Sequence, residues 1–297
     1  MLSGVLESIT SVGMLVFIVA GMAAMGLSLT MSRIVEPLRS PGLVVGLLVA
    51  NFAVVPIAAV LAARMLPMED AAANAIILIG CAAGASFLPR LAQLAKGDPG
   101  LAVGAMVLLM VVTIVYAPIV VPLVVEGASV DPFEIAQSLV VLMLIPLGIG
   151  LIVRARYADL AGDWAGRASQ ASTVGLLLGI GGSILISWRS ILGSIGTWIF
   201  VGAAVLLIVA LAAGWFAGLG RSTGDRSVAA LATAQRNIAA AIVIAISIGG
   251  DTLVYTLVGA LLIPIVLIVL AGEVGKRTGD TGPGATSVEI GSLEQPT

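Results

Sequence analysis

The chain has 297 residues, of which 60% are hydrophobic and 10% are charged, and its formal net charge is −2. A mean hydropathy of +1.17 excludes a soluble globular protein, because soluble domains carry about 25% charged residues. The composition predicts an all-α integral membrane protein, whose surroundings are the lipid bilayer and whose partners do not include nucleic acid. The single cysteine, Cys81, lies within an apolar segment, so we expect no intramolecular disulfide.

Nine apolar segments are each about as long as a membrane-spanning helix, which needs about 20 residues. In chain order they cover residues 8–29, 41–64, 71–94, 100–125, 135–154, 170–188, 194–218, 227–248 and 252–271. We therefore predict a polytopic transmembrane domain over residues 1–272. The polar, Gly- and Thr-rich residues 273–297 predict a disordered cytoplasmic tail. No basic residue precedes the first apolar run, which favours a retained helix over a cleaved signal peptide.

Basic residues gather on one side of this predicted topology. The even-numbered loops carry only two of them, Arg64 and Arg189, together with several acidic residues. The odd-numbered loops and the tail carry Arg33, Arg39, Arg90, Lys96, Arg154, Arg156, Arg167, Arg221, Arg226, Lys276 and Arg277. Because cytoplasmic loops are enriched in Lys and Arg, we predict a plasma or inner membrane protein with its N-terminus outside and its C-terminus in the cytoplasm.

The third segment contains residues that interrupt a helix. Gly84 and Pro89 fall inside it, and proline removes a helical hydrogen bond and crowds the preceding turn. Backbone freed at membrane depth must find partners within the protein or in a water-filled cavity. Ser86, Arg90 and Gln93 follow at helical spacing and share one face, so we place them in a candidate site. The alternative for Arg90 is that it extends to the cytoplasmic headgroups from the end of its segment.

The eighth segment carries three consecutive polar residues, Gln235, Arg236 and Asn237, among Ala, Ile, Val and Leu. An arginine at the bilayer centre costs roughly 2.5–3.5 kcal/mol on insertion scales, so it needs a wet cavity, backbone carbonyls or an anionic ligand. Adjacent helical residues point about 100° apart, so the three cannot all avoid lipid on one regular face. Either this helix lies deep in a bundle or its backbone is broken at Arg236.

A weak internal repeat relates the two halves of the chain. Val115 and Tyr116 follow the third segment, as Val254 and Tyr255 follow the eighth. Interrupted helices at corresponding places in two halves are typical of transporters built from inverted repeats, whose sites lie near the midplane. The fold class predicted is thus an all-α, inverted-repeat transporter with two broken crossing helices.

Several short motifs resemble the bile acid:sodium symporter family of secondary transporters, over roughly residues 15–272. These motifs are GMAAMGLSLTMSRI (21–34), NFAVVP with Asn51, GCAAG (80–84), LAQLAKGDPGLAVG (91–104), LIPLGIGLIVR (144–154) and QRNIAAA (235–241). The resemblance implies a core domain and a panel domain, with the third and eighth helices crossing where both are unwound. The nine segments would correspond to the family's ten-helix form without its first helix.

The same resemblance implies sodium ligands that this chain lacks. A Ser-Asn pair on the first broken helix is replaced by Leu88 and Pro89, and a glutamate on the second by Ala232. Hydroxyl ligands on the following helix are replaced by Ala102 and Met106, and a glutamine is replaced by the shorter Asn51. Sodium, like calcium and magnesium, binds several oxygen ligands. The sequence therefore argues against sodium coupling, and we assign no metal site and no cofactor.

Arg236, alone or with Arg90, is our candidate to replace sodium as a built-in positive charge. Its guanidinium would either hold the freed backbone carbonyls or bind a carboxylate or sulfonate, and the sequence does not rank these roles. The prediction is a carrier that moves a small organic anion by alternating access. The alternatives are an uncoupled or exchange-type anion carrier, a channel, or a ligand-binding sensor. An enzyme is excluded, since the chain has no histidine and its aspartates fall near segment ends, so no catalytic residue is assigned.

Overall fold

A computed structural model describes residues 2–280, apart from 31, 33–34, 36–38, 86, 126–130 and 194–195. Within these ranges the fold is entirely helical, as the composition predicts. The helices are α1 (Leu2–Ser28), α3 (Pro41–Val49), η2 (Ala50–Val54), α4 (Val55–Met65), α5 (Asp70–Cys81), α6 (Leu88–Leu94), α7 (Pro99–Val124), α8 (Pro132–Leu139), η3 (Val140–Leu144), α9 (Ile145–Arg156), α10 (Ala158–Gly193), α11 (Ile199–Ala217), α12 (Thr223–Ala234), α13 (Ile238–Ile248) and α14 (Thr252–Asp280).

Seven helical stretches among the described residues are long and apolar enough to cross a membrane: Ser8–Ser28, Pro41–Met65, Pro99–Val124, Pro132–Arg156, Ile199–Ala217, Thr223–Ile248 and Thr252–Lys276. The predicted span 71–94 is instead divided between α5 and α6, and the predicted span 170–188 lies within the 36-residue α10. The chain is therefore a multi-pass membrane protein, and the count of nine spans stays a prediction.

Two of the long helical stretches, Pro41–Met65 and Pro132–Arg156, contain a π-helical turn shortly before a proline. The turn η2 leads into Pro56 near the start of α4, and η3 leads into Pro146 near the start of α9. A proline ring collides with the carbonyl four residues earlier and has no N–H to donate. A wider π-turn accommodates both the ring and the missing N–H, so each helical stretch continues past its proline. Asn51 lies in the first of these turns.

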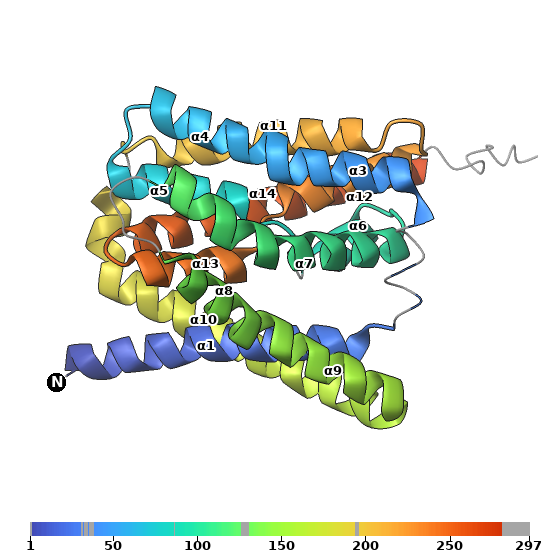
Figure 1. Cartoon of the computed structure of the whole chain (residues 1–297), viewed down its shortest axis with the longest axis horizontal. Coiled ribbons are helices and arrows are strands. Elements are labelled where there is room, and N and C mark those ends of the chain that lie inside the picture. The colour runs from blue at the N-terminus through green and yellow to red at the C-terminus, as the bar shows by residue number, and fades with distance from the viewer. Residues whose placement is uncertain are drawn as a thin grey trace, which may run out of the picture.

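The helices form two groups that lie side by side (Figure 1). In one group α1 packs along α10 and α9, while the other contains α3 to α7 and α11 to α14. The first group is tightly packed through glycines. A Cβ atom on Gly13 of α1 would meet the α10 backbone, and one on Gly26 would meet the α9 backbone. Small residues of this kind let membrane helices approach closely.

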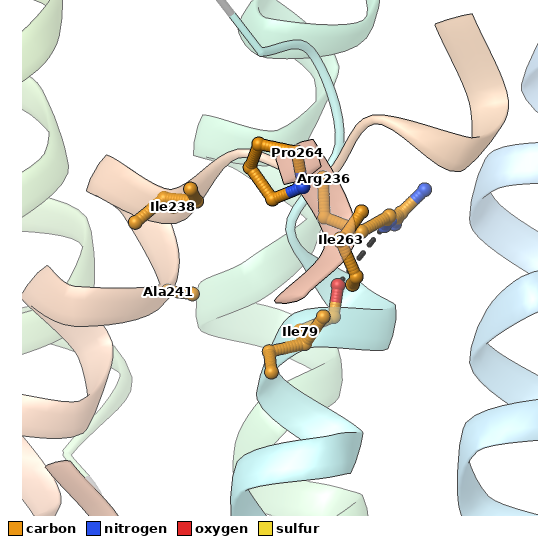
Figure 2. A pocket seen from close by; sticks show the side chains of 6 residues that line it. All are labelled: Ile79, Arg236, Ile238, Ala241, Ile263 and Pro264. Atoms are coloured by element: carbon orange, nitrogen blue, oxygen red, sulfur yellow. Dashed lines mark hydrogen bonds between the residues drawn. The ribbon is translucent and has the colours of Figure 1, made fainter. Parts of the chain in front are cut away.

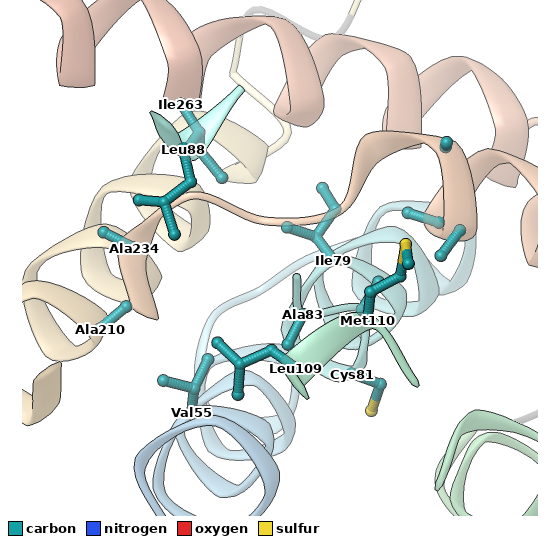
Figure 3. Packing of buried hydrophobic residues seen from close by; sticks show 14 of the residues in the cluster. Val55, Ile79, Cys81, Ala83, Leu88, Leu109, Met110, Ala210, Ala234 and Ile263 are labelled. Carbon is teal, nitrogen blue, oxygen red and sulfur yellow. The ribbon is translucent and has the colours of Figure 1, made fainter. Parts of the chain in front are cut away.

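Most of the apolar core lies in the second group, around the short helices α5, α12 and α13, and residues of α1 such as Ile18 and Met22 extend it. Figure 3 shows residues of this cluster from several segments, among them Val55, Ile79, Ala83, Leu109 and Ala234. Alanine is frequent where the chain leaves α5 and α12, so neighbouring backbones come close there. This core therefore supports the two points at which helices are interrupted.

The C-terminal helix is longer than the sequence predicts. Helix α14 ends at Asp280, so residues 273–280 of the predicted disordered tail are helical. The apolar pattern stops near residue 271, but a helix emerging from the membrane can continue into water while its backbone bonds remain intact. Residues 281–297 lie outside the described residues, and the prediction of a tail there is untested.

Candidate ligand site at a helix crossover

The first break separates α5 from α6. Helix α5 ends at Cys81, residues 82–85 are not helical, and α6 begins at Leu88. Gly84 has φ of +82°, and a Cβ atom there would collide with the backbone of Met110 in α7. Glycine is needed at this point both for its conformation and for its size. Pro89 lies in the first turn of α6, where its missing N–H costs no hydrogen bond, so it begins the second half-helix.

Thr113 of α7 holds the backbone of this break. Its hydroxyl accepts a hydrogen bond from the Ala83 N–H at 3.0 Å and donates to the Ala83 carbonyl at 3.0 Å. A hydroxyl has one donor and two acceptor positions, so it satisfies both backbone groups at once. Sequence reasoning missed Thr113, because a threonine in an apolar helix most often bonds the carbonyl of its own preceding turn.

The second break separates α12 from α13 and falls at the polar cluster. Helix α12 ends at Ala234 and α13 begins at Ile238. Asn237 caps α13, since its Oδ1 accepts from the Ala240 N–H at 3.1 Å. The Asn237 N–H donates to the Ala82 carbonyl at 2.9 Å, and its Nδ2 donates to the Gly84 carbonyl at 3.1 Å. The two breaks are thus hydrogen-bonded to each other, and we call this region, residues 82–85 and 235–237, the crossover.

Arg236 is 2% exposed and bonds carbonyls from both interrupted helices. Its Nε donates to the Ile79 carbonyl at 3.0 Å (Figure 2), and its Nη2 donates to the Gly80 carbonyl at 2.6 Å. Its Nη1 donates to the Thr233 carbonyl at 2.9 Å and to Asn51 Oδ1 at 2.8 Å. Next to it lies a small apolar pocket lined by Ile79, Arg236, Ile238, Ala241, Ile263 and Pro264, with no room for a water molecule.

The charge of Arg236 is balanced by backbone dipoles. The buried polar residues of the described chain include no Asp or Glu, so no buried carboxylate neutralises the guanidinium there. A helix C-terminus carries roughly −0.5 of an elementary charge, and α5 and α12 both end beside Arg236. Two such ends together offset about one positive charge. The arginine thereby stabilises a meeting of helix ends that would otherwise repel each other.

Asn51, in the π-helical turn η2, orients the side chain of Arg236. Besides accepting from Arg236, its Nδ2 donates to the Leu47 carbonyl at 3.0 Å and to Thr233 Oγ1 at 3.1 Å. The Thr233 hydroxyl in turn donates to the Ala229 carbonyl at 3.0 Å. These bonds direct the guanidinium towards η2, which joins α3 to α4 on the side of the bundle opposite α1 and α10 (Figure 1).

A cavity of about 1150 Å³ separates α1 and α10 from the crossover. Arg90 and Gln93 of α6 are exposed in its wall, while Gln235, Arg236 and Asn237 reach it from the second break. The cavity therefore brings together five of the predicted site residues. Asn51 is not among the residues that line it, and Ser86 lies outside the described residues. Most of its wall is apolar, and the hydroxyl-bearing side chains that line it are Ser28, Ser169, Ser172 and Thr173.

Gln235 differs from its polar neighbours in its bonding. It is 2% exposed and lines the cavity. Its Oε1 is buried and has no hydrogen-bond partner among the described residues, although its backbone N–H donates to the Leu231 carbonyl at 2.8 Å. A buried amide oxygen without a donor is costly, so such groups call for an explanation.

Five of the six positions at which sodium ligands are expected carry no side-chain oxygen, and at the sixth, Asn51, the Oδ1 atom accepts a hydrogen bond from Arg236. Leu88, Ala102, Met106 and Ala232 are buried apolar side chains, and Pro89 is partly buried. Where the chain is described, no group of three or more His, Cys, Asp or Glu residues is placed to hold a metal ion. The side chains at these positions do not fit a hard cation.

A family model described as the sodium bile acid symporter family matches residues 14–195, which is more than half of the chain. The chain belongs to the sodium bile acid symporter family. It is also 30% identical over 138 residues to an uncharacterized sodium-dependent transporter, YocS, of Bacillus subtilis strain 168. That match spans 45% of this chain and 42% of the relative, so it covers less than half of either protein.

Membership of the family confirms the resemblance seen in the sequence motifs. The family and the Bacillus relative are transporters, which also confirms that this chain does not belong with enzymes. The matched region includes the first break but ends before α12. The argument for Arg236 therefore rests on its own contacts and not on the family match.

Proposed function

We propose that this protein is a secondary transporter that moves a small organic anion across the membrane by alternating access. The observation that carries this proposal is the cavity of about 1150 Å³ between the two helix groups, with both helix breaks at its wall. Ligand sites in inverted-repeat transporters are built in this way, from half-helix ends near the midplane. The cavity is large enough for an organic molecule.

Access from one side only is supported by the packing around the cavity. Arg90 and Gln93 are exposed on the short helix α6, on the side that the basic loops predict to be cytoplasmic. We infer closure of the other end from α8, which packs against α7 and α13 and whose Ile135 and Leu139 are completely buried. Movement of the group of α1, α9 and α10 against the other group would exchange the open and closed ends.

The charge of the ligand follows from the groups that face the cavity. Arg90 supplies a cation that is not engaged in any ion pair with the described residues. Ile238 and Ala239, in the first turn of α13, also line the cavity, and the N-terminus of a helix favours negative charge. A carboxylate or sulfonate is the complementary group.

We also propose that transport does not require sodium. Arg236 already places a positive charge among the carbonyls at the crossover, where the family resemblance would put sodium ions. Of its two suggested roles, the four hydrogen bonds to carbonyl and amide oxygens favour holding the broken backbone over binding the ligand. The Bacillus relative is described as sodium-dependent, and this chain would differ from it as a uniporter or an anion exchanger.

Uptake of labelled organic anions into proteoliposomes tests the proposal. We expect saturable uptake that is accelerated when unlabelled anion is present inside, as for a carrier but not a channel. Replacing Arg90→Gln should raise the KM by about tenfold or more, because a hydrogen bond to a charged group contributes about 1.5–3 kcal/mol. Arg156→Gln is the matched control, since Arg156 is exposed at the end of α9 and does not line the cavity. Absence of saturable uptake, or equal kinetics for the two variants, would contradict the proposal.

A further inference from the structure

Among the described residues, the buried side-chain polar atoms at the crossover have hydrogen-bond partners with one exception. Arg236 bonds four oxygens, and Asn237 uses both atoms of its amide. Asn51 also uses both, and Thr113 both donates and accepts. Gln235 Oε1 has no partner within the described residues. Gln235 Oε1 is therefore the buried side-chain polar atom of this region that lacks a partner among the described residues.

The exception lies on the cavity side of the crossover. The Arg236 guanidinium is directed towards Asn51 in η2, whereas Gln235 lines the cavity between the two helix groups. Gln235 is the C-terminal cap of α12, and its N–H is already engaged with the Leu231 carbonyl. Its backbone position is thus fixed, while its buried side-chain oxygen, in a residue that lines the cavity, has no partner among the described residues.

An amide oxygen accepts hydrogen bonds and cannot donate them. A carboxylate has no hydrogen to offer, so the negative group of an anion does not satisfy Gln235 Oε1. A second group on the ligand, a hydroxyl or an amide N–H, would do so. A site that pairs a buried polar group with a ligand hydroxyl strongly rejects the analogue that lacks it, because the protein group is then left unpaired.

We propose that Gln235 is a specificity-determining residue that accepts a hydrogen bond from a hydroxyl or N–H group of the transported anion. The substrate class is then an organic anion that carries a hydrogen-bond donor besides its negative group. This inference rests on the proposed function and adds a requirement on the chemistry of the ligand.

The experiment compares matched carboxylates that differ by one hydroxyl, such as 3-phenyllactate with 3-phenylpropionate and 12-hydroxydodecanoate with dodecanoate. Their binding to the purified protein is measured by thermal stabilisation and by competition against labelled anion uptake. We expect the wild-type protein to prefer the hydroxylated member of a pair by about tenfold or more. Gln235→Met, which keeps the length of the side chain but removes the amide, should bring this ratio close to one.

Two further variants make the result specific. Gln93→Met removes the other glutamine of the cavity wall and should leave the ratio unchanged. Gln235→Glu keeps an acceptor oxygen, so it should weaken both members by charge repulsion while preserving their ratio, and it provides a test should Gln235→Met fail to fold. An unchanged ratio in Gln235→Met, or equal wild-type binding of both members, would overturn the inference alone. Failure of the wild-type protein to bind any carboxylate would overturn the proposed function with it.

Discussion

The guanidinium of Arg236 donates to the carbonyl of Gly80 at 2.6 Å, although the two residues are 156 positions apart in the chain. This bond joins the second interrupted helix to the last turn of the first. Two further bonds, to the Ile79 and Thr233 carbonyls, extend the same link to both helix ends. The side chain of Arg236, whose charge is unusual in an apolar segment, thus links the two interrupted helices by hydrogen bonds.

Loss of the Arg236 side chain and its hydrogen bonds should destabilise the protein. In Arg236→Ala four buried oxygens lose a donor, and an orphaned buried group costs about 1–3 kcal/mol, so we expect the free energy of unfolding to fall by about 3 kcal/mol or more. Arg236→Lys should be intermediate, because an ammonium lacks the planar fork that reaches all four oxygens. Thermal unfolding in detergent, followed by circular dichroism, measures the effect. Arg156→Gln serves as the control, and an Arg236→Ala protein as stable as this control would refute the role.

The hydroxyl of Thr113 should matter more than that of a threonine bonded only within its own helix. Thr113→Val keeps the shape of the side chain but leaves the Ala83 N–H and carbonyl without their partner, so we expect a loss of about 1–3 kcal/mol. Thr256 is equally buried, and its hydroxyl donates only to the Thr252 carbonyl of its own helix. Thr256→Val should therefore cost clearly less in the same unfolding assay. Equal costs would show that Thr113 does not hold the first break.

Gly84 should not tolerate even a methyl group. Its φ of +82° is unfavourable for any other residue, and a Cβ atom would meet the Met110 backbone. We expect Gly84→Ala to yield little folded protein, as judged by the monodisperse fraction after detergent extraction. Gly148 of α9 has nothing within 4 Å of an added Cβ atom, so Gly148→Ala should be extracted like the wild type. A well-folded Gly84→Ala protein would mean that the break has another conformation.

The opening of the cavity can be located by chemical labelling. In a Cys81→Ala background, Gln93→Cys places a thiol in the cavity wall, and Phe133→Cys places one at the exposed start of α8. We expect a membrane-impermeant maleimide to reach position 93 from the cytoplasmic side and position 133 from the outside. A transported anion should slow the labelling of position 93 only. Labelling of position 93 from the outside would reverse the predicted orientation.

The breaks themselves could be predicted from local sequence. Gly84 and Pro89 indicate an interruption of the third segment, the three polar residues of the eighth indicate either a buried or a broken helix, and the structure interrupts both segments there. Pro89 illustrates a limit of such reasoning. A proline marks a disrupted helix without saying whether it ends one half or begins the next, and here it begins α6.

The partners of the site residues could not be predicted, because they depend on long-range packing. Nothing near Arg236 in sequence indicates that its donors reach Ile79, Gly80 and Asn51 and leave little for a ligand. Thr113 escaped notice for the same reason, since only the fold brings α7 against the first break. The sequence presents Gln235 as a polar neighbour of Arg236, and its unpaired oxygen distinguishes it only in three dimensions.

The sodium dependence of uptake tests the central claim most directly, which is that Arg236 supplies the positive charge at the crossover. Initial rates of organic-anion uptake are measured in proteoliposomes with an inward sodium gradient and with sodium replaced by choline. We predict equal rates for the wild-type protein in both conditions, and loss of uptake in Arg236→Ala in both. Uptake by the wild-type protein that requires the sodium gradient would contradict the account, because backbone oxygens would then form an ion site despite the arginine.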